Sequence, residues 1–297
     1  MTAPEWRGIE PRDESPHEHG GEHEWIERVG FNFFDAASGL GGIASMEYRP
    51  GERRALAELD VFLPEGPIAV AMAKANEVRR AELSVGRMRF ELEEALTRWR
   101  IRSNDVALVF PRGDDRRGVA SPVELDLKFE ASCEPAGEGG RRTDIDKQRF
   151  MSIVSFGSLE QPGRMTGTLK VGTRELSVDA TGVRERVWGV LGDEAWYAVA
   201  FGTDLAISSR RTSIGGTPLV RDVVFRDAPQ PLDGLEVTRS DGRVEMVAGD
   251  GPEAPRIAGE IVATVPPAST DATVRRAMVR YRWGERSALG LMVTPQG

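Results

Sequence analysis

The sequence predicts an all-β protein, built as sandwiches or barrels with little helix. Hydrophobic and polar residues alternate with a period of two in many segments, which is the pattern of strands rather than helices. Gly, Pro and Asp-Gly turns separate these segments at intervals of roughly 8–12 residues, as hairpins require. Both halves of the 297-residue chain show this pattern, so we expect two domains.

The individual strands are predicted from this alternation, beginning with the segment W-I-E-R-V-G-F-N-F-F. In the first half we expect strands at 25–34, 55–63, 88–92, 97–101, 106–110 and 123–129. In the second half we expect strands at 165–171, 174–178, 195–201, 219–225, 235–237, 243–247, 257–265 and 277–283. Residues 68–83 and 269–277 are the candidates for short helices.

A domain boundary is expected near residue 145. The segment C-E-P-A-G-E-G-G-R-R-T-D-I-D-K-Q (133–148) is polar, rich in Gly and without alternation, as expected of a linker or a long hairpin. We therefore predict a polar leader at 1–24, an N-terminal β domain at 25–145 and a C-terminal β domain at 146–297. Each half holds about eight strands, enough for a barrel that encloses one small apolar ligand.

Composition excludes several classes of partner. The net charge of −8 argues against nucleic acid, and no apolar run approaches the ~20 residues of a membrane span. The N-terminus lacks the features of a secretory signal, and the single Cys133 cannot form an internal disulfide, so we expect a cytoplasmic protein. Arg greatly outnumbers Lys, and Ala and Gly are abundant, which suggests a GC-rich bacterial genome.

The stretch G-V-R-E-R-V-W-G (182–189) places three charged residues directly before Trp188. One interpretation is a structural ion pair at a strand end, with Trp188 filling the core. The other is a site at a barrel mouth, where Glu185 donates a proton and Trp188 forms an aromatic wall. A carboxyl group in an apolar pocket has a raised pKa and can protonate an alkene or carbonyl, while an indole face stabilises cationic charge.

Two further groups of polar residues interrupt the apolar pattern. Glu27 shares a strand face with Phe31, where a charge is costly unless it is paired, so it is either bridged to an Arg or functional. Asn32 lies on the opposite face of the same strand. For Glu160 and Gln161, exposure at a sheet edge is the simpler interpretation.

His17, His19 and His23 are the histidines of the chain, and all lie in the leader. Their spacing is compatible with metal ligation, but a polar leader explains it as well. Triad-type catalysis is excluded unless the leader folds over a barrel. We therefore expect no metal and no organic cofactor, and we expect deletion of residues 1–22 to leave folding and any activity largely intact.

Several ordered motifs resemble a bacterial family of unknown function related to hydroxyneurosporene synthase (carotenoid 1,2-hydratase) and to the double-lipocalin group that contains fungal pericyclases. The motifs are W-I-E-R-V-G-F-N-F-F-D (25–35), E-E-A-L-T-R-W-R-I (93–101), L-E-Q-P-G-R-M-T-G-T-L-K-V (159–171), G-V-R-E-R-V-W-G (182–189) and R-Y-R-W-G-E-R-S-A-L-G-L-M (280–292). The resemblance implies two tandem lipocalin-like antiparallel β-barrel (calycin-type) domains. Glu185 stands where relatives show Asp, Arg186 where some show His and Val187 where many show Ser.

These observations together predict a cofactor-independent enzyme for an apolar terpenoid or polyketide-like substrate, acting by acid-assisted hydration, cyclisation or pericyclic reaction. The alternatives are a non-catalytic lipocalin-like protein that binds a hydrophobic small molecule, and an assembly protein without a cavity. The expected catalytic residues are Glu185, Glu27 and Arg184. The expected substrate-binding residues are Trp188, Asn32, Trp99, Gln161, Tyr197, Tyr281 and Trp283. We expect Glu27, Arg184, Glu185 and Trp188 at the wall of one apolar cavity.

Overall fold

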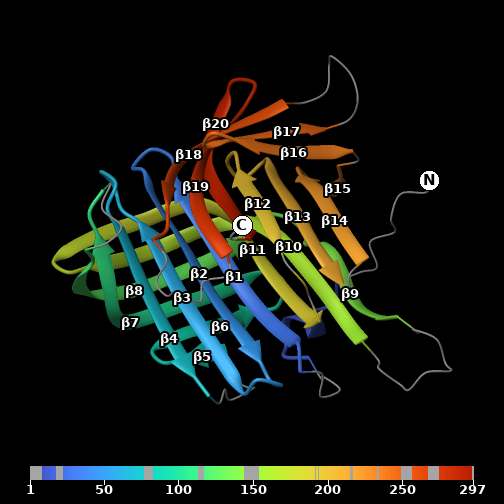
Figure 1. Ribbon diagram of the computed structural model, residues 1–297, viewed down its shortest axis with the longest axis horizontal. Helices are drawn as coiled ribbons and strands as arrows, with labels where there is room; N and C mark the ends of the chain where they lie inside the picture. Colours follow the sequence, from blue (N-terminus) through green and yellow to red (C-terminus); the bar gives the residue numbers. More distant parts are fainter. Residues whose placement is uncertain are drawn as a thin grey trace.

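The computed structural model confirms an all-β fold with little helix (Figure 1). It describes residues 9–17, 23–76, 83–112, 117–143, 154–190, 192, 194–214, 217–232, 234–248, 256–266 and 274–295. Within these residues the one helical element is a short 3-10 turn, η1 (Pro11–Glu14), and the regular structure otherwise consists of strands. The strands form two curled antiparallel sheets, which match the predicted double lipocalin-like fold.

The first sheet contains eleven strands and closes on itself. Its strands are β1 (Trp25–Asp35), β2 (Leu40–Arg49), β3 (Arg54–Phe62), β4 (Ile68–Ala75), β5 (Leu83–Val85), β6 (Met88–Glu94), β7 (Arg98–Phe110), β8 (Val119–Ala131), β9 (Ala136–Thr143), β10 (Val154–Val171) and β11 (Arg174–Val190). Their order is β4-β3-β2-β1-β11-β10-β8-β7-β6-β5, and β9 pairs with β10. A further pairing of β4 with the end of β7 closes the ring.

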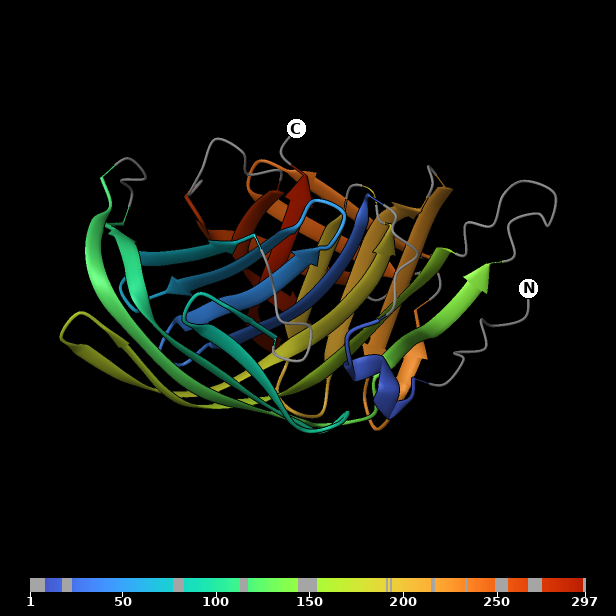
Figure 2. The same ribbon diagram turned by 90° about the horizontal axis from the view of Figure 1, so that it is seen from below.

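The second sheet contains nine strands in the order β15-β14-β13-β12-β20-β19-β18-β17-β16. They are β12 (Ala195–Ala200), β13 (Ala206–Ile214), β14 (Thr217–Phe225), β15 (Pro229–Pro231), β16 (Leu235–Ser240), β17 (Arg243–Ala248), β18 (Arg256–Thr264), β19 (Val274–Trp283) and β20 (Arg286–Pro295). Figure 2 shows the long strands of the first sheet curving beneath the molecule, with the second sheet packed on the opposite side of β1 and β11.

Three apolar layers result from this arrangement. The first fills the ring of the first sheet and includes Phe31, Trp99 and Phe129. The second lies between the sheets and includes Val183 and Trp196. The third lies on the far face of the second sheet, around Tyr281 and Met246 and their neighbours. Successive side chains along a strand lie on opposite faces, so a strand with one face in an apolar layer and the other in a polar environment shows the period of two seen in the sequence.

Several sequence-based expectations are wrong in detail. Residues 68–75 form strand β4 rather than a helix, because their backbone pairs with β3 and, at residues 68–70, with β7, which closes the ring. The polar segment at 133–148, for which a linker or a long hairpin was expected, contains strand β9, whose antiparallel pairing with the next strand β10 agrees with the hairpin. The helix expected at 269–277 is strand from Val274, and residues 269–273 lie outside the described residues.

The two sheets divide between Val190 and Ala195. Strands β10 and β11 therefore belong to the first sheet, where β11 pairs with β1 and β10 pairs with β8. The expected domain boundary near residue 145 remains a prediction, because the division into sheets does not tell which segments fold independently.

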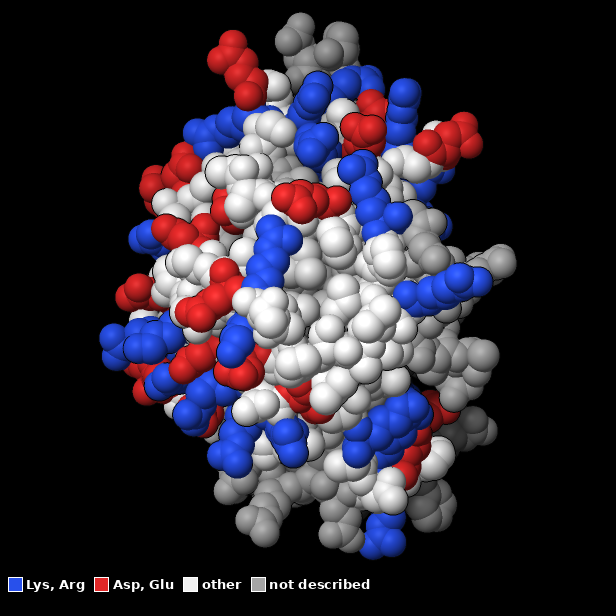
Figure 3. Space-filling model, turned by 90° about the vertical axis from the view of Figure 1, so that its left-hand side faces the viewer, with Lys and Arg blue, Asp and Glu red and all other residues white. Residues whose placement is uncertain are grey.

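The face of the molecule shown in Figure 3 carries interspersed Lys, Arg, Asp and Glu side chains around an uncharged central area. In the part of the chain that the structure describes, no helix is long and apolar enough to cross a membrane.

Candidate functional site

The stretch G-V-R-E-R-V-W-G forms the last part of β11, directly before its final residue Val190, and it is buried. One face of strand β11 points into the ring of the first sheet and the other face packs against the second sheet, so both faces are covered. Arg184, Arg186 and Trp188 point into the ring, while Glu185 points between the sheets. Because a buried charge requires a partner, each of these residues has its own set of contacts.

Arg184 is held at one end of the ring by the turn η1. Its guanidinium donates to both carboxylate oxygens of Glu14, at 2.6 and 3.0 Å, and neither side chain is exposed to solvent. It also donates to Gln161 Oε1 at 2.8 Å and lies 5.9 Å from the ring centroid of Trp99. The Gln161 amide donates to the backbone oxygens of Leu96 and Cys133. Glu160 and Gln161 are thus buried within β10, and the expected exposure at a sheet edge is wrong.

A second group, which we call the barrel-end cluster, consists of His17, Glu27, Arg186 and Trp188. Glu27 on β1 is paired in register with Trp188 on β11, so both side chains meet inside the ring. The leader returns over this end and places the His17 imidazole on the Trp188 indole, with centroids 3.9 Å apart and planes inclined by 8°. Gly157 lies opposite Trp188 on β10, where a Cβ atom would overlap the indole, so a glycine is required there.

Glu27 is the hub of the barrel-end cluster. Its Oε1 accepts hydrogen bonds from the His17 backbone N–H at 3.0 Å and from Arg186 Nη2 at 2.7 Å, and it lies 2.9 Å from His17 Nδ1. Burial raises the pKa of Glu27, but the contacts with His17 and Arg186 outweigh it, and the pKa lies below its ordinary value. A charged Glu27 requires His17 Nδ1 to carry its proton, which leaves Nε2 as the reactive nitrogen.

Polar atoms of the barrel-end cluster remain available for further hydrogen bonds. His17 Nε2, Arg186 Nε and Nη1, and Trp188 Nε1 are buried and have no hydrogen-bond partner among the residues that the structure describes. Asp13 Oδ1 is 4.0 Å from His17 Nε2, beyond hydrogen-bond distance. Burial lowers the pKa of Arg186, yet a guanidinium remains protonated at neutral pH. The cluster therefore combines a charged donor, an indole N–H and an imidazole nitrogen able to exchange a proton.

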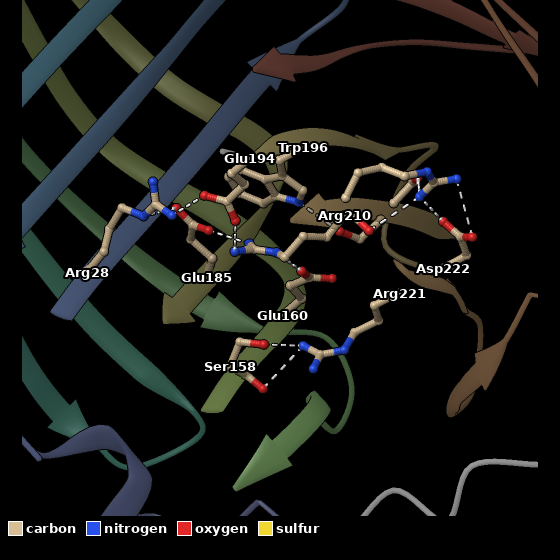
Figure 4. A network of polar contacts seen from close by, with 12 residues as sticks. Arg28, Ser158, Glu160, Glu185, Glu194, Trp196, Arg210, Arg221 and Asp222 are labelled. Atoms are coloured by element: carbon tan, nitrogen blue, oxygen red, sulfur yellow. Dashed lines mark hydrogen bonds and ion pairs between the residues drawn. The ribbon is translucent and has the colours of Figure 1, made fainter. Parts of the chain in front are cut away.

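Glu185 belongs to a different group, the inter-sheet cluster, made of Arg28, Glu160, Glu185, Glu194 and Arg210 (Figure 4). Arg210 on β13 contacts all three carboxylates, including Glu160 Oε1 at 2.6 Å. Arg28 on β1 contacts Glu194 and lies 3.4 Å from Glu185. Burial lowers the pKa of Arg210, but the three carboxylates outweigh it and raise the pKa above its ordinary value. This cluster ties β1, β10 and β11 of the first sheet to the second sheet.

The remaining predicted residues lie outside the barrel-end cluster, where they hydrogen-bond the backbone of a strand or pack in an apolar layer. Both atoms of the Asn32 amide bond the backbone of Val183, at 2.7 and 3.1 Å, where the ladder between β1 and β11 is interrupted. Tyr197, Tyr281 and Trp283 lie in the apolar layer of the second sheet. The Tyr281 hydroxyl donates to the Leu291 oxygen at 3.1 Å, and burial raises its pKa well above the ordinary value.

The structure thus brings Glu27 and Trp188 together, places Arg184, Gln161 and Trp99 beside each other deeper in the ring, and separates all of them from Glu185. Two hollows, of about 480 and about 210 Å³, lie at the interface of the sheets. None of the ten predicted site residues lines either hollow.

Sequence reasoning missed His17, Glu14 and Arg210. His17 was treated as part of a polar leader. Because the chain has no histidine beyond residue 23, an imidazole can reach the β domains only if the leader folds back onto them. Glu14 and Arg210 carry no local signal, since their partners are far away along the chain. His19 lies outside the described residues, and within those residues no group of three or more His, Cys, Asp or Glu side chains is arranged to hold a metal.

Comparisons with known proteins agree on the fold. The family model described as a domain of unknown function (DUF7064) matches residues 10–294. No curated protein sequence matches the chain. An AttH-like protein from Nitrosomonas europaea has a similar structure, with a TM-score of 0.65, 12% identity and 98% of each chain covered. Kievitone hydratase from Nectria haematococca has a TM-score of 0.59 and 12% identity, with 99% of this chain and 95% of the hydratase covered. CghA with Sch210972 has a TM-score of 0.50 and 11% identity, with 94% and 93% covered.

Proposed function

We propose that this chain, which belongs to the DUF7064 family of domains of unknown function, is an enzyme whose barrel-end cluster performs acid–base chemistry on an apolar, oxygen-bearing small molecule. The pairing of His17 with Glu27 beside Arg186 and Trp188 carries this proposal. A protein of the same fold is named as a hydratase, which supports hydration as the reaction class.

The roles follow from the contacts. Glu27 orients the His17 ring through its contact with Nδ1, as a carboxylate does for a catalytic imidazole. His17 Nε2 donates a proton to an alkene carbon, which leaves a cationic carbon. Water then adds to that carbon, and the proton released from the water returns to Nε2. Cyclisation differs in that an internal hydroxyl or alkene of the substrate replaces the water.

Arg186 and Trp188 would hold an oxygen atom next to the reacting carbon. Their unpartnered N–H groups are buried donors, and burying a donor without an acceptor costs about 1–3 kcal/mol. A water nucleophile, a hydroxyl or a carbonyl of the substrate satisfies these donors, whereas a pure hydrocarbon does not. We therefore favour a polyketide-like or terpenoid substrate that carries both an alkene and an oxygen atom over a pure hydrocarbon terpenoid.

The expected role of Glu185 as proton donor is replaced in this proposal. Glu185 is engaged by Arg210 and Arg28 on the far face of β11, where it stabilises the contact between the sheets. Glu27 and His17 provide the acid–base pair instead.

The test uses prenylated phenols and acyclic isoprenoid alcohols incubated with the protein in D₂O. Mass spectrometry detects addition of water and incorporation of deuterium at carbon. We expect turnover by the wild type, a loss of about 10²–10⁴-fold for His17→Gln, and unchanged turnover for the control His23→Gln. Equal rates for the two variants would contradict the assignment of His17.

A non-catalytic binding protein is the second candidate, and one observation favours it. The larger hollow between the sheets is lined mainly by apolar side chains and lacks an acid–base pair. The absence of any turnover by the wild type across the substrate panel, combined with saturable ligand binding, would favour this candidate.

A further inference from the structure

The larger hollow, which we call the inter-sheet hollow, lies at the opposite end of the molecule from the barrel-end cluster. The first sheet contributes the β3–β4 turn and the end of β7, and the second sheet contributes β18, β19 and β20. Its volume of about 480 Å³ is within the range of small-molecule pockets, roughly 300–1,000 Å³. Strand β1 links the two sites. Glu27 of the barrel-end cluster is eight residues, or about 26 Å, from Asp35 at the end of the strand, and Gly39 in the following turn lines the hollow.

The floor of the inter-sheet hollow is apolar. Phe62, Ile68 and Phe110 come from the first sheet, and Met278 and Leu289 come from the second. These five side chains belong to the layer between the sheets, so the hollow is the open end of that layer. Val262 on the rim is 42% exposed and leaves apolar surface available to a ligand.

The rim carries two arginines from opposite sheets, Arg112 after β7 and Arg280 on β19. Both are exposed, and neither forms an ion pair with another of the described residues. The stem of Arg112 packs over Gly66, where a Cβ atom would lie 2.6 Å from Arg112 Cδ. Gly66 also has a positive φ of 106°, so a glycine allows both the turn and the approach of the arginine.

We propose that the inter-sheet hollow binds a fatty acid, with the hydrocarbon tail on the apolar floor and the carboxylate between Arg112 and Arg280. Guanidinium groups match carboxylates in charge and in hydrogen-bond geometry. A cationic head group would be repelled by two arginines, and a neutral one would gain no charge contact from them. Among the lining residues the two arginines outnumber the one carboxylate, Glu65, while Glu260 on β18 lies opposite Arg280 in the strand pair.

Binding is tested with the fluorescent fatty acid cis-parinaric acid and with its methyl ester as the neutral probe. We expect the acid to bind the wild type saturably and the ester to bind more weakly. Arg112→Gln combined with Arg280→Gln should weaken binding of the acid about tenfold and leave binding of the ester unchanged. Arg256→Gln, an exposed arginine on β18 outside the hollow, is the matched control and should have no effect.

A second variant tests the location independently of charge. Ala263→Phe places a larger side chain in the hollow and should weaken binding of both probes, while far-UV circular dichroism verifies that the variant remains folded. His17→Gln should bind the acid like the wild type, which separates this site from the barrel-end cluster. Failure of the wild type to bind the acid, equal binding of acid and ester, or loss of binding in His17→Gln would each overturn the proposal.

Discussion

Replacement of Glu14 by Gln tests whether the leader is part of the fold. Glu14 and Arg184 form a two-point ion pair that is fully buried at the end of the ring. The Gln amide can still present one oxygen to Arg184 Nη2 and to the Leu96 N–H, but its NH₂ group faces Arg184 Nη1, which loses its acceptor. Removing one partner of a buried pair costs about 3–5 kcal/mol, and the retained oxygen places the expected cost near the lower limit, at about 3 kcal/mol.

The assay is equilibrium urea unfolding at about pH 7, followed by tryptophan fluorescence. Arg12→Gln is the matched control, because Arg12 lies in the same turn and its pair with Glu10 is largely exposed. We expect that control to change the free energy of unfolding by less than about 1 kcal/mol. Adding Arg184→Met to Glu14→Gln should recover part of the loss, since the double variant no longer buries an unpaired charge. A Glu14→Gln variant as stable as Arg12→Gln, or strictly additive effects in the double variant, would refute the reasoning.

Three further predictions concern other charged or reactive groups. Arg210→Gln should destabilise the protein by about 3–5 kcal/mol by leaving buried carboxylates unpaired, whereas Arg164→Gln, which breaks an exposed pair with Asp179, should cost less than about 1 kcal/mol in the same urea assay. The pKa of Glu27 is lowered from its ordinary value of 4.5, so the charged carboxylate stabilises the folded state fully above pH 4.5, and this contribution is lost as the pH falls below 4.5. In Glu27→Gln, the free energy of unfolding should therefore depend less steeply on pH in the acid range. Burial raises the pKa of the Cys133 thiol to about 11, so alkylation at about pH 8 should be much slower in the native protein than in urea, and equal rates would contradict this burial.

Alternation along the strands was sufficient to predict the fold class, because each strand has at least one face in an apolar layer. Strands without alternation were missed. Strand β4 reads as a continuous apolar run, since it lies between two layers, and β9 has almost no apolar side chains. Periodicity reports the contrast between faces, and these strands have no such contrast.

The site was predicted in part for the same reason. Glu27 and Trp188 were identified because a charge within an apolar strand, and an indole beside charges, depart from the local pattern. Glu185 was assigned to the same cavity because adjacency in sequence was given more weight than alternation, which separates neighbours in a strand onto opposite faces. His17 and Glu14 were placed outside the fold because a polar leader carries no pattern, and the expectation that residues 1–22 can be removed without effect conflicts with their buried contacts.

The position of the His17 ring is the most direct test of the proposed site. The protein has three histidines, so ¹H–¹³C spectra of the imidazole groups are simple, and His17→Gln assigns the signal of interest. A ring 3.9 Å from the Trp188 indole and nearly parallel to it should show strong upfield shifts of its carbon-bound protons, and these shifts should disappear in Trp188→Leu. Three histidine signals with the shifts of an unstructured peptide would contradict the account, because His17 would then not be part of the barrel-end cluster.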